Sequence, residues 1–370
     1  MQTLLNQLVY FGFFQSLLLL FIYGLSPKNR KRINGYMAFF IGVVSFGLIG
    51  KVLYTAGVGN YNFRLISLSE LSALLFGPTI FLFTRSIVQR KLFSKQDLTH
   101  YLPAIVYTIF VALYFVIPND SVLSARNKTG ELMRVIYACH TVGLLVNVFY
   151  WMKGWQLLKT FETDVQNELS YEPQTSFLKN FLILTGICLL VWTGLLLISF
   201  LGYDMLERNT RPYIWMLLTL IILFITYYGM IAPQVLQLVP VVKQEVKKYT
   251  QSKLSASDLD RLKEQLDSLM LEKKPYLNSK LLKAELAEML GVNNPELARL
   301  LNESIGMNFF EYVNYYRIKE FVALAKTEKA QQLTFFGLAQ EAGFHSKTTF
   351  NKSFKKLMGT SPSAYFNKNL

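Results

Sequence analysis

The stretch "AQEAGFHSKTTFNKSFKKLMGTSPSAYF" (residues 339–366) decides how the C-terminal part of this chain folds. It predicts a short helix that ends at a turn on Gly343 and a second helix that begins at Ser346, whose side chain can cap it. In the second helix Phe350, Phe354 and Leu357 recur at i, i+4 and i+7 and share one face. The opposite face is basic and polar, which fits DNA in a major groove or else a solvated surface.

The same pattern occurs upstream in "LLKAELAEMLGVNNPELARLLNE" (residues 281–303). A leucine-faced helix ends at Gly291, and either Asn293 or Asn294 can cap the next helix, with Pro295 in its first turn. Arginine and asparagine can read bases, whereas lysines suit phosphates. The DNA contacts expected from the two units are Asn294, Glu296, Arg299, Asn302, Ser346, Lys347, Thr348, Asn351, Lys352, Lys355 and Lys356.

Between the two units, "NFFEYVNYYRIKEFVALAKT" (residues 308–327) predicts one helix of roughly 18 residues, about 27 Å long. That length is near the ~34 Å repeat of B-DNA. A rigid spacer of this size would set two readers into successive major-groove segments.

Residues 276–370 resemble the AraC-type transcription regulator domain. The signature in the second half of this region is Gly343, Phe344, Ser346, Phe350, Phe354, Lys355, Gly359, Ser361 and Pro362. The resemblance implies two helix-turn-helix units joined by a helix, which bind promoter DNA, often as a dimer. Ala298 stands where the family commonly has a polar residue, which implies altered base reading by the first unit.

The N-terminal part is apolar and carries no charge before Lys28. A spanning helix needs about 20 mostly apolar residues. The first run is followed, not preceded, by basic residues and lacks a cleavage site, so it is not a signal peptide. Windows without Asp, Glu, Lys or Arg predict seven transmembrane helices at 1–27, 33–50, 71–84, 98–119, 135–152, 180–203 and 212–242.

Basic residues in the loops predict the orientation, because cytoplasmic loops are enriched in Lys and Arg. The first, third and fifth loops between these windows hold 11 such residues and the alternate loops hold 7. The N-terminus is then outside and the C-terminus in the cytoplasm of a bacterium, where DNA is reached. The combination of parts resembles membrane-tethered AraC-family regulators of Bacteroidota-like bacteria.

Charge density predicts the domain boundaries. Residues 1–239 hold 18 Lys and Arg with 10 Asp and Glu, whereas residues 240–370 hold 20 and 14 in about half the length. We expect a sensor-like membrane domain at 1–239, an amphipathic linker helix at 240–274 and the DNA-binding domain at 275–370. Ser257 is the expected cap of the linker helix. Its apolar stripe packs either on its own domain or on a second copy in a homodimer; the stripe is Leu259, Leu262, Leu266 and Leu269.

Polar groups inside the spans are candidates for sensing an unknown signal, because their burial is costly unless they are paired. These are Glu70, His140 and Asn147, for which the alternative role is hydrogen bonding between helices. Cys139 and Cys188 lie in apolar runs, so we expect no disulfide, metal or cofactor, and no enzyme motif is present.

The sequence therefore predicts an all-α fold: a seven-helix transmembrane bundle followed by a cytoplasmic domain with two helix-turn-helix units. The expected function is transcription regulation from the bacterial inner membrane, with promoter DNA, the lipid bilayer and a signal as partners. Cutting of the tether near Pro240 would be a variant of this mechanism. A transporter or membrane enzyme with an attached regulatory domain is the alternative.

Overall fold

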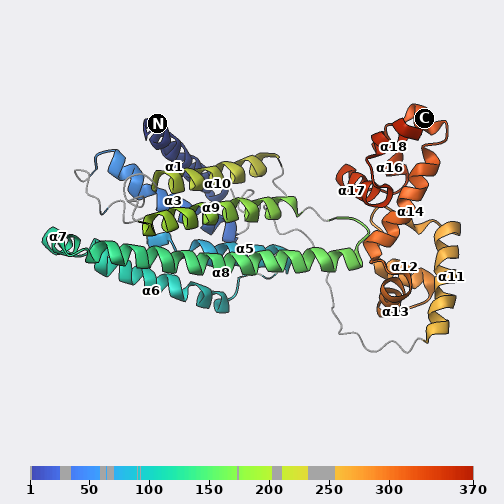
Figure 1. Cartoon of the computed structure of the whole chain (residues 1–370), viewed down its shortest axis with the longest axis horizontal. Helices are drawn as coiled ribbons and strands as arrows, with labels where there is room; N and C mark the ends of the chain where they lie inside the picture. The colour runs from blue at the N-terminus through green and yellow to red at the C-terminus, as the bar shows by residue number, and fades with distance from the viewer. Residues whose placement is uncertain are drawn as a thin grey trace. The chain divides into compact units, whose positions relative to one another are not determined.

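The computed structural model describes residues 2–25, 35–58, 64, 71–89, 91, 93–172, 175–201, 211–231 and 255–369. Within these residues every regular element is helical, as expected, and β structure is limited to one isolated bridge. The chain forms two compact units (Figure 1): Met1–Lys159 with Gln174–Val242, and Thr160–Pro173 with Lys243–Leu370. The second unit is therefore built from two separate parts of the sequence.

The first unit consists of apolar helices and one short polar helix. Helix α1 packs on α3 and α10, α3 packs on α5, and α9 packs on α10. Its elements are α1 (Gln2–Leu25), α3 (Gly35–Thr55), α5 (Phe76–Val88), η2 (Lys95–Tyr101), α6 (Leu102–Val111), η3 (Ala112–Val116), α7 (Asp120–Lys128), α8 (Glu131–Glu168), α9 (Ser176–Phe200) and α10 (Arg211–Ile231).

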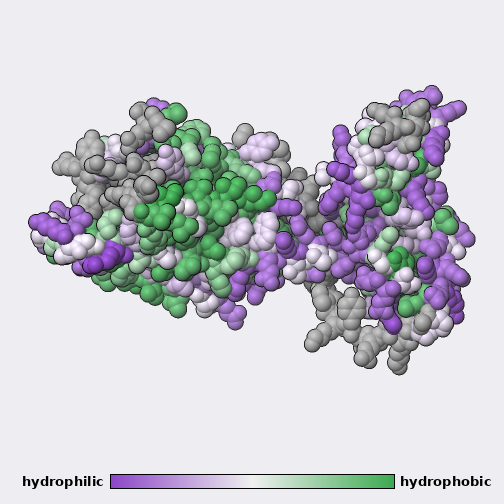
Figure 2. All heavy atoms as spheres, viewed as in Figure 1, coloured by the Kyte–Doolittle hydropathy of each residue, from purple (hydrophilic) through white to green (hydrophobic). Residues whose placement is uncertain are grey.

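Five segments within the described residues are long and apolar enough to cross a membrane. Two further apolar helices are shorter, Phe76–Val88 and Tyr213–Tyr228. Hydrophobic residues cover much of the visible face of this unit (Figure 2), although a soluble protein would bury them. The five long segments are Leu4–Ile22, Gly35–Thr55, Lys95–Val116, Glu131–Glu168 and Ser176–Phe200.

Helix α8 extends well beyond the expected apolar window at 135–152. It has 38 residues and ends at Glu168, and its last part, from Thr160, belongs to the second unit. Helix α8 therefore contains residues of both units.

The second unit contains the expected pair of helix-turn-helix units. The joining helix α14 has 16 residues, close to the roughly 18 expected. The elements are α11 (Ala256–Glu272), η5 (Pro275–Leu277), α12 (Lys283–Leu290), α13 (Asn294–Arg299), η6 (Leu300–Ile305), α14 (Phe309–Leu324), α15 (Lys329–Gln332), α16 (Phe335–Glu341), α17 (Lys347–Met358) and α18 (Pro362–Asn369).

The leucine stripe of α11 lies in the core of its own unit. Leu266 is fully buried, and the stripe packs with residues of α12, α13 and α14. Of the two alternatives for this stripe, packing on its own domain is what the structure has. The cap of α11 is Ser255, not Ser257 as predicted, because Ser255 accepts from the backbone N–H of Asp258 and the Asp258 carboxylate accepts from the N–H of Ser255.

The two helix-turn-helix units have different cores. The core of the first is rich in leucine and tyrosine, and includes Leu286, Leu297 and Tyr312. The core of the second is rich in phenylalanine, with Phe321 against Phe350 at 4.6 Å between ring centroids. Helix α14 contributes to both cores and so fixes the spacing of the two helix-turn-helix units.

Candidate nucleic-acid interface

Helix α17, the second candidate reader, is fixed by its cap, its turn and its apolar face. The Ser346 hydroxyl accepts from the backbone N–H of Thr349 at 3.1 Å, which satisfies one free donor of the first turn. Gly343 has φ 94°, and a Cβ there would lie 2.3 Å from the carbonyl oxygen of Tyr276, so only glycine fits. On the shared apolar face Phe350 and Phe354 are buried, whereas Leu357 is 41% exposed.

The outer side of α17 is divided into two groups of polar residues. The first group is exposed and consists of Lys347, Thr348, Asn351 and Lys355. The second group consists of two lysines that hold carboxylates from other elements. The Lys352 ammonium lies 2.7 Å from Glu172, and the Lys356 ammonium is paired with Glu311 of α14. Six of the seven expected contacts are thus on the surface, and Ser346 is half-buried as the cap.

Helix α13, the first candidate reader, uses much of its polar surface internally. Asn293, one of the two expected caps, accepts from the N–H of Glu296, and the Glu296 carboxylate accepts from the N–H of Asn293. The Arg299 guanidinium donates to Glu303 at 2.7 Å, one turn further along. Asn302 is exposed, whereas Asn294 is half-buried with its side-chain oxygen lacking a hydrogen bond.

Ala298 belongs to the interior of this reader. Its side chain is only 6% exposed, next to the fully buried Leu297. Ala298 therefore contributes to packing, and its effect on base reading stays a prediction.

Arg317, in the middle of α14, is a structural residue that sequence reasoning missed. It is fully buried, and burial lowers its pKa to about 9, which leaves it charged at neutral pH. Its guanidinium donates to the carbonyl oxygens of Tyr276 (2.8 Å), Asn278 (2.8 Å) and Ser170 (2.6 Å), and to the Ser170 hydroxyl (3.0 Å). The signal in the sequence is its position between Val313 and Phe321, at four-residue spacing on a buried face.

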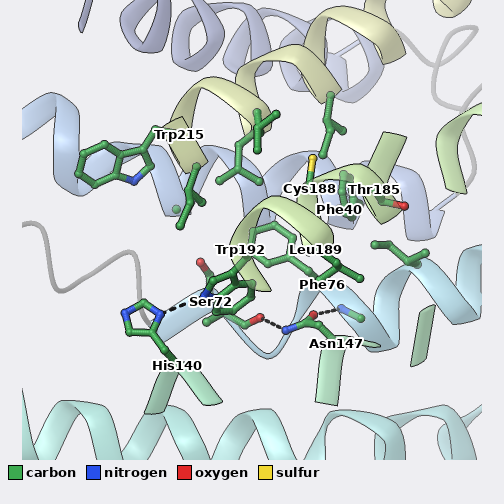
Figure 3. Close-up of a pocket in the computed structure, with 18 residues that line it drawn as sticks. Phe40, Ser72, Phe76, His140, Asn147, Thr185, Cys188, Leu189, Trp192 and Trp215 are labelled. Atoms are coloured by element: carbon green, nitrogen blue, oxygen red, sulfur yellow. Dashed lines mark hydrogen bonds between the residues drawn. The ribbon is translucent and has the colours of Figure 1, made fainter. Parts of the chain in front are cut away.

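The candidate signal residues lie in the first unit, and two of them are described. His140 and Asn147 line a cavity of about 120 Å³ among α3, α5, α8, α9 and α10 (Figure 3). The Trp192 indole N–H donates to His140 Nδ1 at 3.3 Å. Most of the cavity wall is apolar, and Phe40, Phe76 and Trp215 contribute to it. Glu70 lies outside the described residues.

Asn147 joins α8 to the start of α5. Its side-chain oxygen accepts from the N–H of Gly77 at 2.6 Å, and its amide donates to the carbonyl oxygens of Ala73 and Gly143. A Cβ on Gly77 would lie 2.9 Å from the Asn147 backbone, so glycine permits this close approach. Helix-to-helix hydrogen bonding, the alternative role for this residue, is therefore present.

Comparison with known proteins supports the C-terminal interpretation. Residues 286–368 match the family model described as a helix-turn-helix domain. No curated protein and no solved structure matches the chain. Among the described residues, no group of His, Cys, Asp and Glu is arranged to hold a metal ion. Residues 286–368 are therefore an AraC-type helix-turn-helix domain, which supports DNA binding and transcription regulation.

Proposed function

We propose that the chain is a membrane-tethered regulator that binds promoter DNA from the cytoplasmic face of the bacterial inner membrane. Seven spans are supported by the five long apolar segments together with the two shorter apolar helices. Residues 1–239, apart from Thr160–Pro173, form the membrane domain in this proposal. Residues 275–370 bind DNA, with α11 as part of the DNA-binding unit.

The membership of Thr160–Pro173 in the second unit is the observation that carries the proposal. This segment belongs to the fifth loop of the predicted topology. Because it folds with the helix-turn-helix residues, the fifth loop and the C-terminal part lie on one side of the membrane. The loops on that side are the ones rich in Lys and Arg, which supports a cytoplasmic location for them in this proposal.

The DNA contacts differ in kind along the two readers. Asn351 and Arg299 are suited to base edges, because their side chains can make two parallel hydrogen bonds to adenine and guanine respectively. Lys347, Lys355 and the paired Lys352 and Lys356 are suited to phosphates. The remaining expected contacts fix the orientation of the two readers on the duplex in this proposal; they are Ser346, Thr348, Asn294, Glu296 and Asn302.

The signal in this proposal is an apolar molecule that enters the cavity beside His140 and Asn147. Asn147 already has hydrogen-bond partners for its oxygen and amide, so the available wall is mainly hydrocarbon and aromatic. Apolar cavities of roughly 150 Å³ bind ligands of the size of benzene. A ligand changes DNA binding only if it favours one arrangement of the bundle over another.

The topology is tested with reporter fusions after Leu370. A reporter active only in the cytoplasm should work there, and one active only in the periplasm should be silent. The opposite result would remove the membrane-tethered regulator, since the reader would never meet DNA.

The regulatory function is tested by mapping bound genomic sites in cells that carry the full chain. We expect a small set of promoter sites that share one sequence. An Asn351→Ala chain should lose these sites while staying in the membrane fraction. Uniform, sequence-independent recovery of DNA from both chains would contradict specific promoter binding.

A further inference from the structure

The residues that join α8 to α9 are part of the DNA-binding unit, although they come from the middle of the membrane half of the sequence. Leu169 forms the isolated antiparallel bridge with Leu282, and the N–H of Ser170 donates to the carbonyl oxygen of Leu281 at 3.2 Å. Leu169 is 5% exposed and Ser170 is fully buried. We name Glu168–Glu172 the docked segment; it enters the unit as a short strand-like piece beside the start of α12.

Two buried charges hold the docked segment in place. Arg317 donates to both the carbonyl and the hydroxyl oxygen of Ser170. The Lys283 ammonium, whose side chain is 5% exposed, pairs with Glu168 at the end of α8. Buried cations need such partners, because an unpaired buried charge is costly. The segment therefore completes the unit and is not a loose loop lying on its surface.

The end of the docked segment lies on the second reader. The Glu172 carboxylate lies 2.7 Å from the Lys352 ammonium, and its other oxygen is 3.5 Å from the Thr349 hydroxyl. Tyr171 packs edge-on against His345, in the turn before α17, at 6.0 Å between ring centroids. A carboxylate thus lies on one side of α17, next to a lysine suited to phosphate.

We propose that the docked segment is a built-in competitor for DNA: Glu172 occupies the phosphate-binding side of α17 and must leave it when DNA binds. The inference rests on the proposed function and names the regulation of its DNA site. The two carboxylate oxygens of Glu172, which contact Lys352 and Thr349, resemble the oxygens of a phosphate. The single positive charge of Lys352 cannot neutralise both the carboxylate and a phosphate. Glu172 also repels the DNA backbone, whose charge density governs non-specific affinity.

Helix α8 contains the cavity-lining His140 and Asn147, and its last residue, Glu168, is the first residue of the docked segment. In this proposal only Tyr171 and Glu172 leave α17 when DNA binds, while Ser170 stays bound to Arg317.

The first test compares two neutralised carboxylates in the full chain, purified in detergent. Glu172→Gln removes the competitor. Glu162→Gln is the matched control, since it removes the same charge while the ion pairs of Lys352 and Lys356 are with Glu172 and Glu311. Binding is measured to the duplex that the unmodified chain enriches most from a random-sequence library. We expect Glu172→Gln to bind about two- to fivefold tighter, the range for one exposed ion pair, and Glu162→Gln to be unchanged.

The second test detects the contact directly. Carbodiimide joins a carboxylate and an ammonium that touch, so the free full chain should give a peptide pair linked between Glu172 and Lys352, identified by mass spectrometry. A saturating amount of the selected duplex should remove this pair and leave the Glu168–Lys283 pair in place.

The outcomes separate the two proposals. If no duplex is enriched, specific DNA binding by the full chain fails. If a duplex is enriched but the Glu172–Lys352 link persists when it is bound, or Glu172→Gln binds no tighter than Glu162→Gln, the competitor is excluded while the proposed function stands. Absence of the link in the free chain also excludes it.

Discussion

The two readers of the DNA-binding unit differ in where their charges find partners. In the first, Glu296 caps its own helix through Asn293, and Arg299 pairs with Glu303 one turn away. In the second, Lys352 and Lys356 pair with carboxylates from distant elements, Glu172 of the docked segment and Glu311 of α14. Local pairs form whenever the helix forms. Distant pairs depend on the tertiary arrangement. A movement of another segment can therefore break the ion pairs of the second reader, whereas those of the first stay within its own helix.

The largest expected effect tests the residue that links α14 to the docked segment. Arg317→Met should destabilise the second unit by about 3–5 kcal/mol, because the carbonyl oxygens it serves become buried without donors. Hydrogen exchange of α14 amides in the detergent-solubilised chain measures this. Arg261→Met is the matched control, since Arg261 is 70% exposed. A decrease in the free energy of unfolding of less than about 1 kcal/mol would mean that Arg317 does not hold the docked segment.

The next effect tests the core under the first reader. Leu266→Ala should cost about 2–5 kcal/mol, as for other fully buried leucines, and should leave the oligomeric state unchanged. Leu271→Ala on the same helix is the control, because Leu271 is 65% exposed. Exchange rates in α11–α13 and the mass of the detergent-solubilised chain give both quantities. A dissociated oligomer with unchanged stability would restore the stripe as a dimer contact.

Base reading compares the two readers directly. Asn351→Ala should cost about 1–3 kcal/mol on the selected duplex and little on a scrambled one. Arg299→Ala should cost less, because Glu303 already occupies its guanidinium. Lys355→Ala should weaken both duplexes alike and reduce the salt dependence. Titrations at two salt concentrations separate these roles. An equal loss of affinity on both duplexes for Asn351→Ala would mean that Asn351 positions the protein on DNA and does not read a base.

The smallest effect concerns Glu311, which pairs with Lys356. Burial acts to raise the pKa of Glu311, but the Lys356 ammonium and the Asn308 N–H outweigh it, so the pKa is lowered from 4.5. A lowered folded-state pKa stabilises the fold above the unfolded-state pKa, and this is lost as pH falls through the folded-state value. Glu311→Gln should therefore cost about 0.2–1 kcal/mol at pH 7.

The control for this substitution is the same stability measurement at low pH. Below the lowered pKa of Glu311, where the carboxyl is protonated in both states, Glu311→Gln and the unmodified chain should have equal stability, measured by exchange of α14 and α17 amides. A difference that persists unchanged in acid would show that Glu311 acts through packing, not charge.

Local rules were sufficient for the elements of both readers. Glycines at the turns, capping side chains and four-residue apolar spacing predicted α12, α13, α16 and α17 because each signal acts within one or two turns of helix. The same rules failed at one cap, since Ser255 rather than Ser257 caps α11 through its box with Asp258. Apolar spacing also did not decide burial, because Leu357 shares a face with Phe350 and Phe354 and is 41% exposed.

The sequence by itself determined the helical fold, the apolar segments and the two basic readers, because hydropathy and helical period are properties of short stretches. Only the tertiary structure decided that Leu266 packs on its own unit and that Arg317 and Lys352 hold Ser170 and Glu172. These residues lie 147 and 180 positions apart. No local pattern encodes such pairs, since what joins them is the burial of charge that forms only when the distant segments meet.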